Sequence, residues 1–344
     1  MTPTVVLGRL VLLGLCVSLV HCGAYMDVDD TPRTALQAGA PPHLIAAEDP
    51  PVLDVQGGAV WPMQTDVHLA VVNMPDSAET SIDTVAKYLA ARESDPLRLA
   101  KALHDWIAYN VASDASLDES PLLPANAERA LKTRKGSSAD QAALFTALAK
   151  HTGNPDLEVR YVTGNARSVS RVGEQYGYHA WNVVHCKGQS YMVDVSWDGG
   201  TYRTDYLFTP PDIFAKTHYP DWAEDLHTSR SLTRTEFDAQ PLVEPRFYSL
   251  ALSLDQAPAR AKGEVELVVD DPYGVKIAAE IIPVIDGPHD KSSVTARPCE
   301  VHQGKKLIAD CKLPRAGKYT VMVFAKTGTT RVDEVAAFQV TSES

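Results

Sequence analysis

Residues 134–145 read RKGSSADQAALF, and a helix is expected to begin inside this stretch. Ser137 and Ser138 are of a residue type that favours helix starts, and apolar residues follow at helical spacing. The pattern predicts a helix from Ser138 to about His151, with Gly153 as its stop signal. By residue type alone, a serine at such a position is more often a helix cap than a nucleophile.

The rest of the chain divides into a helical part and a part rich in strands. Helical spacing marks residues 81–92, 96–111 and 127–131. Alternation with a period near two predicts strands over residues 157–163, 178–186 and 190–197. Short strand-like segments follow at residues 248–254, 265–269, 277–284, 307–311, 319–325 and 336–340. Helices, then strands, then an all-β tail predict an α+β domain followed by a β-sandwich.

Two of the predicted strands carry ionisable residues that a hairpin would bring together. Lys187 and Gly188 predict a two-residue turn between these strands. In that register His179 is opposite Ser196, and Asp194 lies on the same face, diagonal to His179. A carboxylate that binds one imidazole nitrogen fixes the tautomer and leaves the other nitrogen available as a base. Without further context, such a pair is more often structural than catalytic.

The opposite face of this hairpin is predicted to pack in the core. It presents Ala180, Val184 and Cys186 on one strand, with Tyr191, Val193, Val195 and Trp197 on the other. Cys186 therefore lies on the other face of the His179 strand, roughly 23 Å from His179 at the rise of a strand. We expect that it cannot act as a nucleophile beside His179.

Three motifs resemble those of the transglutaminase-like superfamily and occur in the family's order. RKGSSADQAALF (134–145) is similar to the motif around the catalytic cysteine, HAWNV (179–183) to the histidine motif and VDVSWD (193–198) to the aspartate motif. Trp106-Ile107, YLFTP (206–210) and HYPD (218–221) also fit, the last two resembling the branch of kyphoscoliosis-peptidase-like and cytokinesis-associated proteins. The resemblance covers residues 80–230 approximately. It implies a papain-like fold, in which the helix that carries the nucleophile packs on an antiparallel sheet that carries His and Asp.

The same resemblance assigns the triad positions to Ser138, His179 and Asp194, with Trp181 and Trp197 as supporting residues. Ser138 stands where the family has cysteine. A hydroxyl does not hold an anion at rest near neutral pH, so the preformed pair of thiolate and imidazolium is lost. We expect no cofactor and no metal at this site.

Two functions are compatible with this departure from the family. The first is a catalytically inactive transglutaminase-like domain, which acts as a binding or scaffold module at the cell envelope with a protein or peptide partner. The second is an active serine-dependent amidase, peptidase or acyl hydrolase that uses the three triad positions. Nucleophile chemistry favours the first, so a pseudoenzyme is the preferred interpretation and enzymatic activity stays an open question.

The first residues are typical of an export signal. Arg9 is the one charge before Asp27, and the apolar run 10–20 is too short to span a membrane. LVHC at residues 19–22 resembles a lipobox, in which Cys22 would become a lipidated N-terminus. The alternative is ordinary signal cleavage before Tyr25. Either route predicts an exported protein. With a lipid anchor it would lie in the cell envelope, in the periplasm or on the outer surface, and without one it would be secreted.

These signals divide the 344 residues into four parts. They are a signal peptide (1–24), an acidic Pro-rich linker (25–60), a transglutaminase-like domain (61–240) and an Ig-like β-sandwich (241–344). The formal net charge of −12 argues against nucleic acid as a partner, and an N-terminal lipid is the one membrane contact expected. In the last part, Cys299 and Cys311 are expected to form a disulfide in an oxidising compartment, with two unpaired core thiols as the alternative.

Overall fold

The computed structural model describes residues 53–55, 59–114, 124–169, 177–284, 295–327 and 331–343. The predicted signal peptide, including Cys22, and the predicted linker up to residue 52 lie outside these ranges. The described end of that linker is not irregular, because β1 (Leu53–Val55) pairs antiparallel with β2 (Ala59–Trp61). Among the described helices, none is both long enough and apolar enough to cross a membrane.

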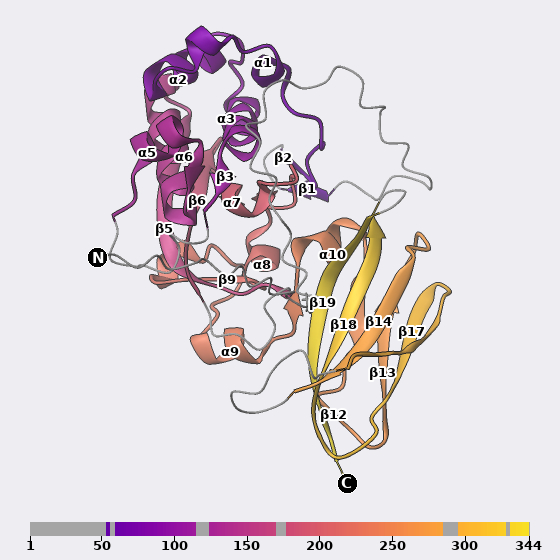
Figure 1. The fold of residues 1–344 in the computed structure, drawn as a ribbon. Coiled ribbons are helices and arrows are strands. Elements are labelled where there is room, and N and C mark those ends of the chain that lie inside the picture. Colours follow the sequence, from indigo (N-terminus) through magenta and orange to yellow (C-terminus); the bar gives the residue numbers. More distant parts are fainter. Residues whose placement is uncertain are drawn as a thin grey trace, which may run out of the picture. The chain divides into compact units, whose positions relative to one another are not determined.

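Helices build the first half of the transglutaminase-like region (Figure 1). They are α1 (Leu69–Val72), η1 (Asp76–Ala78), α2 (Ile82–Ala90), α3 (Pro96–Asn110), α5 (Ala127–Thr133) and α6 (Ser138–Thr152). Asp95 accepts hydrogen bonds from two backbone amides of α3, and Gly153 ends α6 with a φ of 70°. The apolar faces share one core that includes Trp106 and Phe145, both fully buried. The predicted helices are therefore confirmed.

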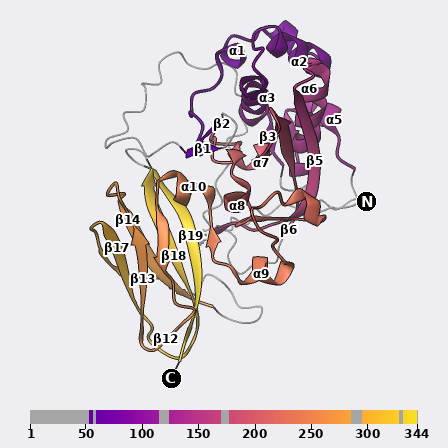
Figure 2. The ribbon, with the colours of Figure 1, turned by 180° about the vertical axis from the view of Figure 1, so that it is seen from behind.

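An antiparallel sheet of order β8-β7-β6-β5-β9 packs against α6 (Figure 2). Its strands are β5 (Leu157–Ala166), β6 (Gly177–Cys186), β7 (Gln189–Val193), β8 (Leu207–Thr209) and β9 (His218–Pro220). Asn182 of β6 joins the sheet to the helix, since its Nδ2 donates to the Ala142 carbonyl oxygen and to Thr146 Oγ1, both at 3.0 Å. Helices on an antiparallel sheet are the α+β arrangement that the sequence predicts.

Shorter elements connect these layers. Just before α6, β3 (Ala112–Ser113) pairs in parallel with β4 (Lys135–Gly136). The later connections are α7 (Val195–Asp198), α8 (Pro211–Phe214), η3 (Ala223–Asp225) and α9 (Arg234–Ala239). Pro211 begins α8 at a helical position where its missing N–H has no cost.

The predicted hairpin of β6 and β7 is confirmed near its turn. Lys187 and Gly188 both have positive φ, and Asn182 pairs with Val193 in the register expected for a two-residue turn. The predicted core face is buried, but the opposite face is buried as well, because Trp181 belongs to a second apolar cluster. This hairpin is therefore covered on both sides.

The prediction of a strand as far as Trp197 is wrong. β7 ends at Val193, because the Asp194 side chain accepts hydrogen bonds from the amides of Ser196 and Trp197 and thereby begins α7. Ser196 is consequently not the cross-strand partner of His179. Trp197 leaves the predicted core face and lies against the ring of His179, with 5.0 Å between ring centroids.

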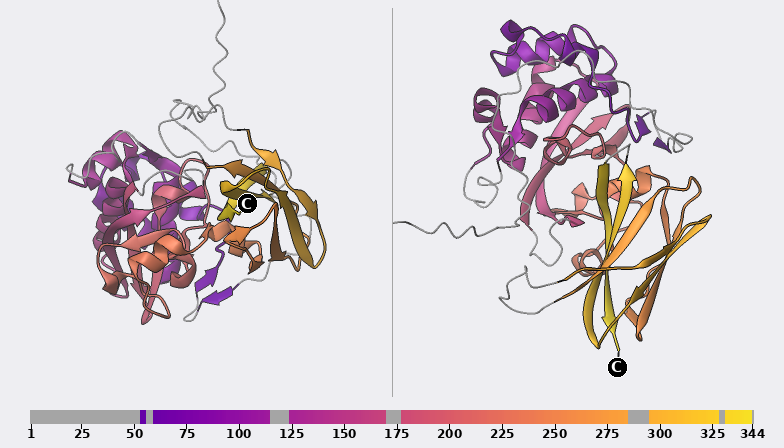
Figure 3. Two further views of the ribbon diagram at one scale, coloured as in Figure 1. Left: turned by 90° about the horizontal axis from the view of Figure 1, so that it is seen from below. Right: turned by 45° about the vertical axis from the view of Figure 1, so that its right-hand side comes forward.

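The C-terminal region is a β-sandwich (Figure 3). One sheet has the order β10-β19-β18-β14-β15 with β12 on β19, and the other has the order β11-β13-β17-β16. The first sheet consists of β10 (Leu242–Val243), β12 (Arg260–Ala261), β14 (Ile277–Pro283), β15 (Arg297–Pro298), β18 (Gly317–Thr327) and β19 (Arg331–Ser342). The second consists of β11 (Ser253–Gln256), β13 (Glu264–Asp270), β16 (Glu300–His302) and β17 (Lys306–Lys312). Residues of both sheets, such as Leu267 and Val323, share one core, so the predicted sandwich is confirmed.

The prediction of a strand over residues 248–254 holds only at the end of this segment. α10 (Pro245–Ser249) occupies its beginning, and β11 forms only from Ser253. Pro245 is the first residue of α10, where its fixed φ is suited to a helix start. The apolar residues of this segment therefore belong first to a helix and then to a strand.

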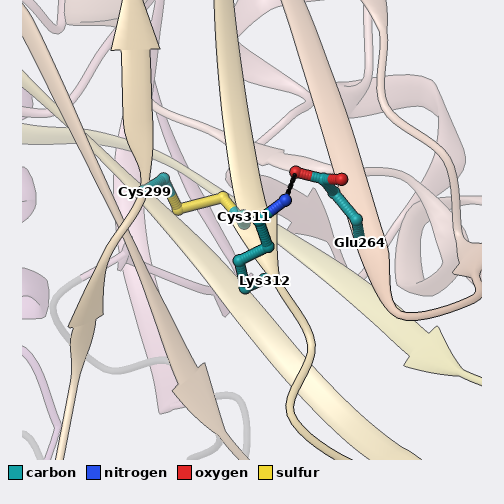
Figure 4. The surroundings of a disulfide bond; sticks show 4 residues. All are labelled: Glu264, Cys299, Cys311 and Lys312. Atoms are coloured by element: carbon teal, nitrogen blue, oxygen red, sulfur yellow. Dashed lines mark hydrogen bonds and ion pairs between the residues drawn. A yellow bond between two sulfur atoms is a disulfide. The ribbon is translucent and has the colours of Figure 1, made fainter.

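A disulfide joins Cys299, just before β16, to Cys311 of β17, with 4.5 Å between the Cα atoms (Figure 4). Cys311 is fully buried in the sandwich core, and the neighbouring Lys312 extends to Glu264 of β13. The bond thus links β17 to the segment that leads into the edge strand β16. Cys186, in the other domain, is a buried free thiol.

Gly164 of β5 allows β9 to lie close against β5. A Cβ at residue 164 would be 2.3 Å from the Tyr219 carbonyl oxygen, 2.6 Å from Trp181 Cη2 and 2.7 Å from Pro220 Cα. We expect Gly164→Ala to lower the free energy of unfolding by about 2–4 kcal/mol, because the backbone of β9 would have to move. Urea unfolding followed by circular dichroism measures this change.

The matched control is Gly177→Ala. Gly177 begins the neighbouring strand β6, and its Cβ position has nothing within 4 Å. This substitution should change the free energy of unfolding by less than about 1 kcal/mol, in the stabilising direction if at all. Equal losses in the two variants would contradict the close approach of β9.

Candidate functional site

Ser138 is the first residue of α6 and not its cap. Ser137 is the cap: its Oγ accepts from the Asp140 amide at 3.2 Å, and Asp140 Oδ2 accepts from the Ser137 amide at 3.2 Å. Arg129 Nη2 contacts both oxygens of Asp140, at 2.8 and 2.7 Å, and so anchors the helix start. Ser138 is 3% exposed and belongs to the first turn, where the helix dipole stabilises negative charge.

β6 runs in the same direction as α6, so both elements begin at the same end of the domain. Leu157, shortly after the end of α6, pairs with Cys186 at the end of β6, whereas Gly164 pairs with His179 near its start. Burial raises the pKa of Tyr161 to about 12, and nearby Tyr178 and Asp140 add to this rise. The register of β5 and β6 therefore places the start of β6, with His179, toward the end of α6 that contains Ser138.

His179 and Asp194 are in direct contact, with 2.7 Å between His179 Nε2 and Asp194 Oδ2. The other oxygen, Oδ1, accepts from the Ser196 amide at 3.0 Å, from Ser196 Oγ at 2.7 Å and from the Trp197 amide at 3.3 Å. Burial opposes ionisation of Asp194, but the charge of His179 and the hydrogen bonds of two histidines outweigh it and hold its pKa far below the ordinary value. Since Nε2 is occupied by Asp194, Nδ1 of His179 is the nitrogen left for a nucleophile.

His218 is a second imidazole on the same carboxylate, and the sequence did not reveal this role. Its Nε2 lies 3.1 Å from Asp194 Oδ2, and its Nδ1 lies 2.8 Å from Thr217 Oγ1. Burial lowers the pKa of His218 to about 4, although the contact with Asp194 acts in the opposite direction. β9 brings His218 beside the hairpin by pairing with β5, so its proximity depends on long-range pairing. The histidine of the HYPD motif lies in a short strand-like segment, and this is the sequence signal that could have found it.

Aromatic rings enclose these two histidines. His218 stacks on Phe214 with 3.9 Å between centroids, and Trp181 and Trp197 lie 5.0 and 4.6 Å from the ring of His218. The enclosure excludes water and strengthens the electrostatic interactions inside it. The indole N–H of Trp181 is buried and has no hydrogen-bond partner in the described part of the structure, so it is a donor suited to a ligand oxygen.

Three side chains of this cluster could hold a metal ion. His179, Asp194 and His218 each offer one ligand atom, and these atoms all lie within 4.8 Å of one another. All three residues are buried. The site is therefore a buried carboxylate that two imidazoles share, surrounded by aromatic rings.

A buried polar network holds the far end of α7. His104 is fully buried, and its two ring nitrogens lie 3.0 Å from Asp105 Oδ1 and 3.1 Å from Asp198 Oδ2. Asp198, the last residue of α7, also accepts from the Tyr206 amide with both oxygens. Burial raises the pKa of Asp198 to about 6. Burial lowers the pKa of His104, but its hydrogen bonds to Asp105 and Asp198 outweigh this effect and raise it.

The raised pKa values make the folded protein retain protons that the unfolded chain releases. The stability that such groups contribute is present at low pH and is lost as pH rises. For Asp198 the loss begins at about pH 4, and for His104 it occurs as pH rises through the raised pKa of this group. Asp198→Asn cannot ionise at this position. We expect its free energy of unfolding, relative to the wild type, to rise by roughly 2 kcal/mol between pH 4.5 and pH 8.

Denaturant unfolding at several pH values measures this difference. The matched control is Asp156→Asn, because Asp156 is exposed and lies outside the network. The control removes a carboxylate outside the network and should leave the pH dependence of the network in place. A difference between Asp198→Asn and the wild type that is constant with pH would contradict the proton storage in the network.

Comparison with known proteins assigns both regions of the chain. Residues 83–195 match the transglutaminase-like superfamily, and residues 234–344 match the KY-like, immunoglobulin-like domain. The kyphoscoliosis peptidase of Homo sapiens is 24% identical over 164 residues, which are 42% of this chain and 24% of the peptidase. That of Mus musculus is 25% identical over 158 residues, 40% of this chain and 23% of the peptidase. The chain thus covers about a quarter of the length of these curated relatives.

These matches agree with the motifs around residues 138, 179 and 194 and with the two observed folds. The identities are low, so they support the domain types rather than a shared activity. The chain carries a domain of the transglutaminase-like superfamily followed by a KY-like, immunoglobulin-like domain.

Proposed function

We propose that this transglutaminase-like domain is an exported binding module without thiol chemistry. The observation that carries the proposal is Ser138, which occupies the first position of α6 where the family's cysteine is expected. A helix start and a nearby imidazole can hold a thiolate, but they do not deprotonate a serine hydroxyl at rest. The domain keeps the architecture around the site and lacks the ground-state nucleophile.

The burial of the site supports this proposal. Ser138, His179 and Asp194 are 3%, 7% and 1% exposed, so little of the triad faces solvent. The indole N–H of Trp181 is buried and unpaired in the described part of the structure, so a peptide carbonyl can accept from it only after the surrounding side chains open. A protein or peptide ligand is therefore the partner class that we propose, at the cell envelope or in the secreted fraction.

A serine-dependent amidase, peptidase or acyl hydrolase is the second candidate. The intact His179–Asp194 contact favours it, because Asp194 fixes the imidazole in the orientation that a general base requires. The relatives are named peptidases, which makes an amide the first substrate class to test. In this case Ser138 would attack and His179 would take its proton during the attack.

A fluorophosphonate probe separates the two candidates, because it labels serines that a general base activates. We expect no labelling of the wild-type protein, measured by intact mass after incubation. Labelling of the wild type that is lost in Ser138→Ala would contradict the proposal. Ser253→Ala is the matched control, since Ser253 lies on the exposed side of β11 in the other domain.

Ser138→Cys should restore a reactive thiol. The helix start and the imidazole stabilise the thiolate, so alkylation by iodoacetamide at pH 7 should be at least about tenfold faster than that of Cys186. Cys186 is a suitable internal reference, because burial raises its pKa. Mass spectrometry of tryptic peptides measures both rates in one sample.

The control variant for this experiment is Ser138→Cys combined with His179→Ala. Loss of the imidazole should return the rate to that of an ordinary thiol. An unchanged rate in the double variant would show that His179 does not act on residue 138. Gain of amidase activity in Ser138→Cys would further show that thiol chemistry is the one missing part.

A further inference from the structure

Two imidazoles point the same nitrogen at one carboxylate oxygen. His179 Nε2 lies 2.7 Å and His218 Nε2 lies 3.1 Å from Asp194 Oδ2. The second carboxylate oxygen, Oδ1, is held by α7, which leaves Oδ2 to face the histidines. The three residues come from β6, from the end of β7 and from β9, so the arrangement is built by the sheet.

We propose that His179, Asp194 and His218 form a binding site for a divalent transition-metal ion, with Zn²⁺ as the best fit. Two histidines and one carboxylate are a ligand set that this ion accepts in proteins. Such a metal site goes beyond the proposed function and does not use Ser138 as a ligand.

Two of the three separations between ligand atoms are close to those of a metal site. With zinc–ligand bonds of about 2.0–2.2 Å, ligand atoms of a tetrahedral site are roughly 3.3 Å apart. The observed separations from Asp194 Oδ2 are 2.7 and 3.1 Å, and all three ligand atoms lie within 4.8 Å of one another. The two pairs with Asp194 therefore need shifts of a few tenths of an ångström, and the two histidine nitrogens, at most 4.8 Å apart, must come to roughly 3.3 Å.

The surroundings of His218 match those of a metal ligand. Thr217 Oγ1 has one proton and two acceptors within reach, the Phe214 carbonyl oxygen at 3.1 Å and His218 Nδ1 at 2.8 Å. When that proton goes to Phe214, Nδ1 of the imidazole is the donor in its contact with Thr217. In this arrangement Nε2 of His218 carries a lone pair directed at a carboxylate oxygen. A metal-bound histidine has the same tautomer and donates its other N–H to an oxygen, and a cation removes the repulsion between the two lone pairs.

In the alternative arrangement, hydrogen bonds and no metal ion hold the three side chains together. Thr217 Oγ1 then donates to His218 Nδ1, and His218 Nε2–H donates to Asp194. In that case the cluster is a hydrogen-bonded carboxylate and needs no ion. The two arrangements differ in metal affinity and in which nitrogen of His218 carries the proton, so experiment separates them.

A bound ion would also explain why the cluster tolerates serine at residue 138. The imidazole of His179 cannot bind a metal through Nε2 and keep the orientation by Asp194 that general-base catalysis needs. Metal binding and a silent nucleophile position are thus compatible, whereas an active hydrolase would be inhibited by the ion.

The test uses the full chain after removal of metal with a chelator, titrated with Zn²⁺ in a calorimeter. We expect one Zn²⁺ per chain, and at least tenfold weaker binding by His218→Gln, checked for folding by circular dichroism. The matched control is His302→Gln, because exposed His302 lies 3.6 Å from Glu300 and 3.5 Å from Asp310 and is a surface site for adventitious ions. This control should bind Zn²⁺ as the wild type does.

X-ray absorption at the zinc edge keeps the proposal testable if His218→Gln does not fold. The wild-type spectrum should show two imidazole ligands and a carboxylate oxygen at about 2.0–2.2 Å. Absence of binding, a spectrum without imidazole, or loss of binding in His302→Gln but not in His218→Gln would each overturn the proposal. A proton on Nε2 of His218, seen by nitrogen-15 NMR with Zn²⁺ present, would overturn it as well.

Discussion

The carboxylate of Asp194 is the interaction on which the rest of the site depends. A buried carboxylate is costly unless donors surround it, and here one oxygen is satisfied by the start of α7 and the other by two imidazoles. This requirement ends β7, turns the chain into α7 and brings Trp197 against His179. The geometry of this buried cluster therefore follows from satisfying one buried charge.

The layers around Asp194 explain why it stays in place. Asn182 fixes β6 on α6, Gly164 admits β9 beside β5, and the His104–Asp198 network holds the far end of α7. Each of these contacts joins elements that are distant in sequence. The site is thus supported from the helical layer, from the sheet and from the connection after β7.

The sequence predicted what local chemistry determines. The bounds of α3 and α6 follow from Asp95, Ser137 and Gly153, and the hairpin register follows from Lys187 and Gly188. The strand predicted to Trp197 was wrong because alternating apolar residues continue past Asp194, while a side-chain cap overrides the alternation. His218 has no local signal of its role, since only the pairing of β9 with β5 brings it to Asp194. Export, lipidation of Cys22 and the linker up to residue 52 concern residues outside the described ranges and stay predictions.

The first residue of α6 and the imidazole that Asp194 orients form one site only if they meet. The distance from Ser138 Oγ to His179 Nδ1 in a high-resolution crystal structure measures this directly. We expect a separation of about 3.5 Å or less, within reach of a hydrogen bond. A separation beyond about 6 Å, with Asp194 still bound to His179, would contradict it, because the three groups would then not form one site.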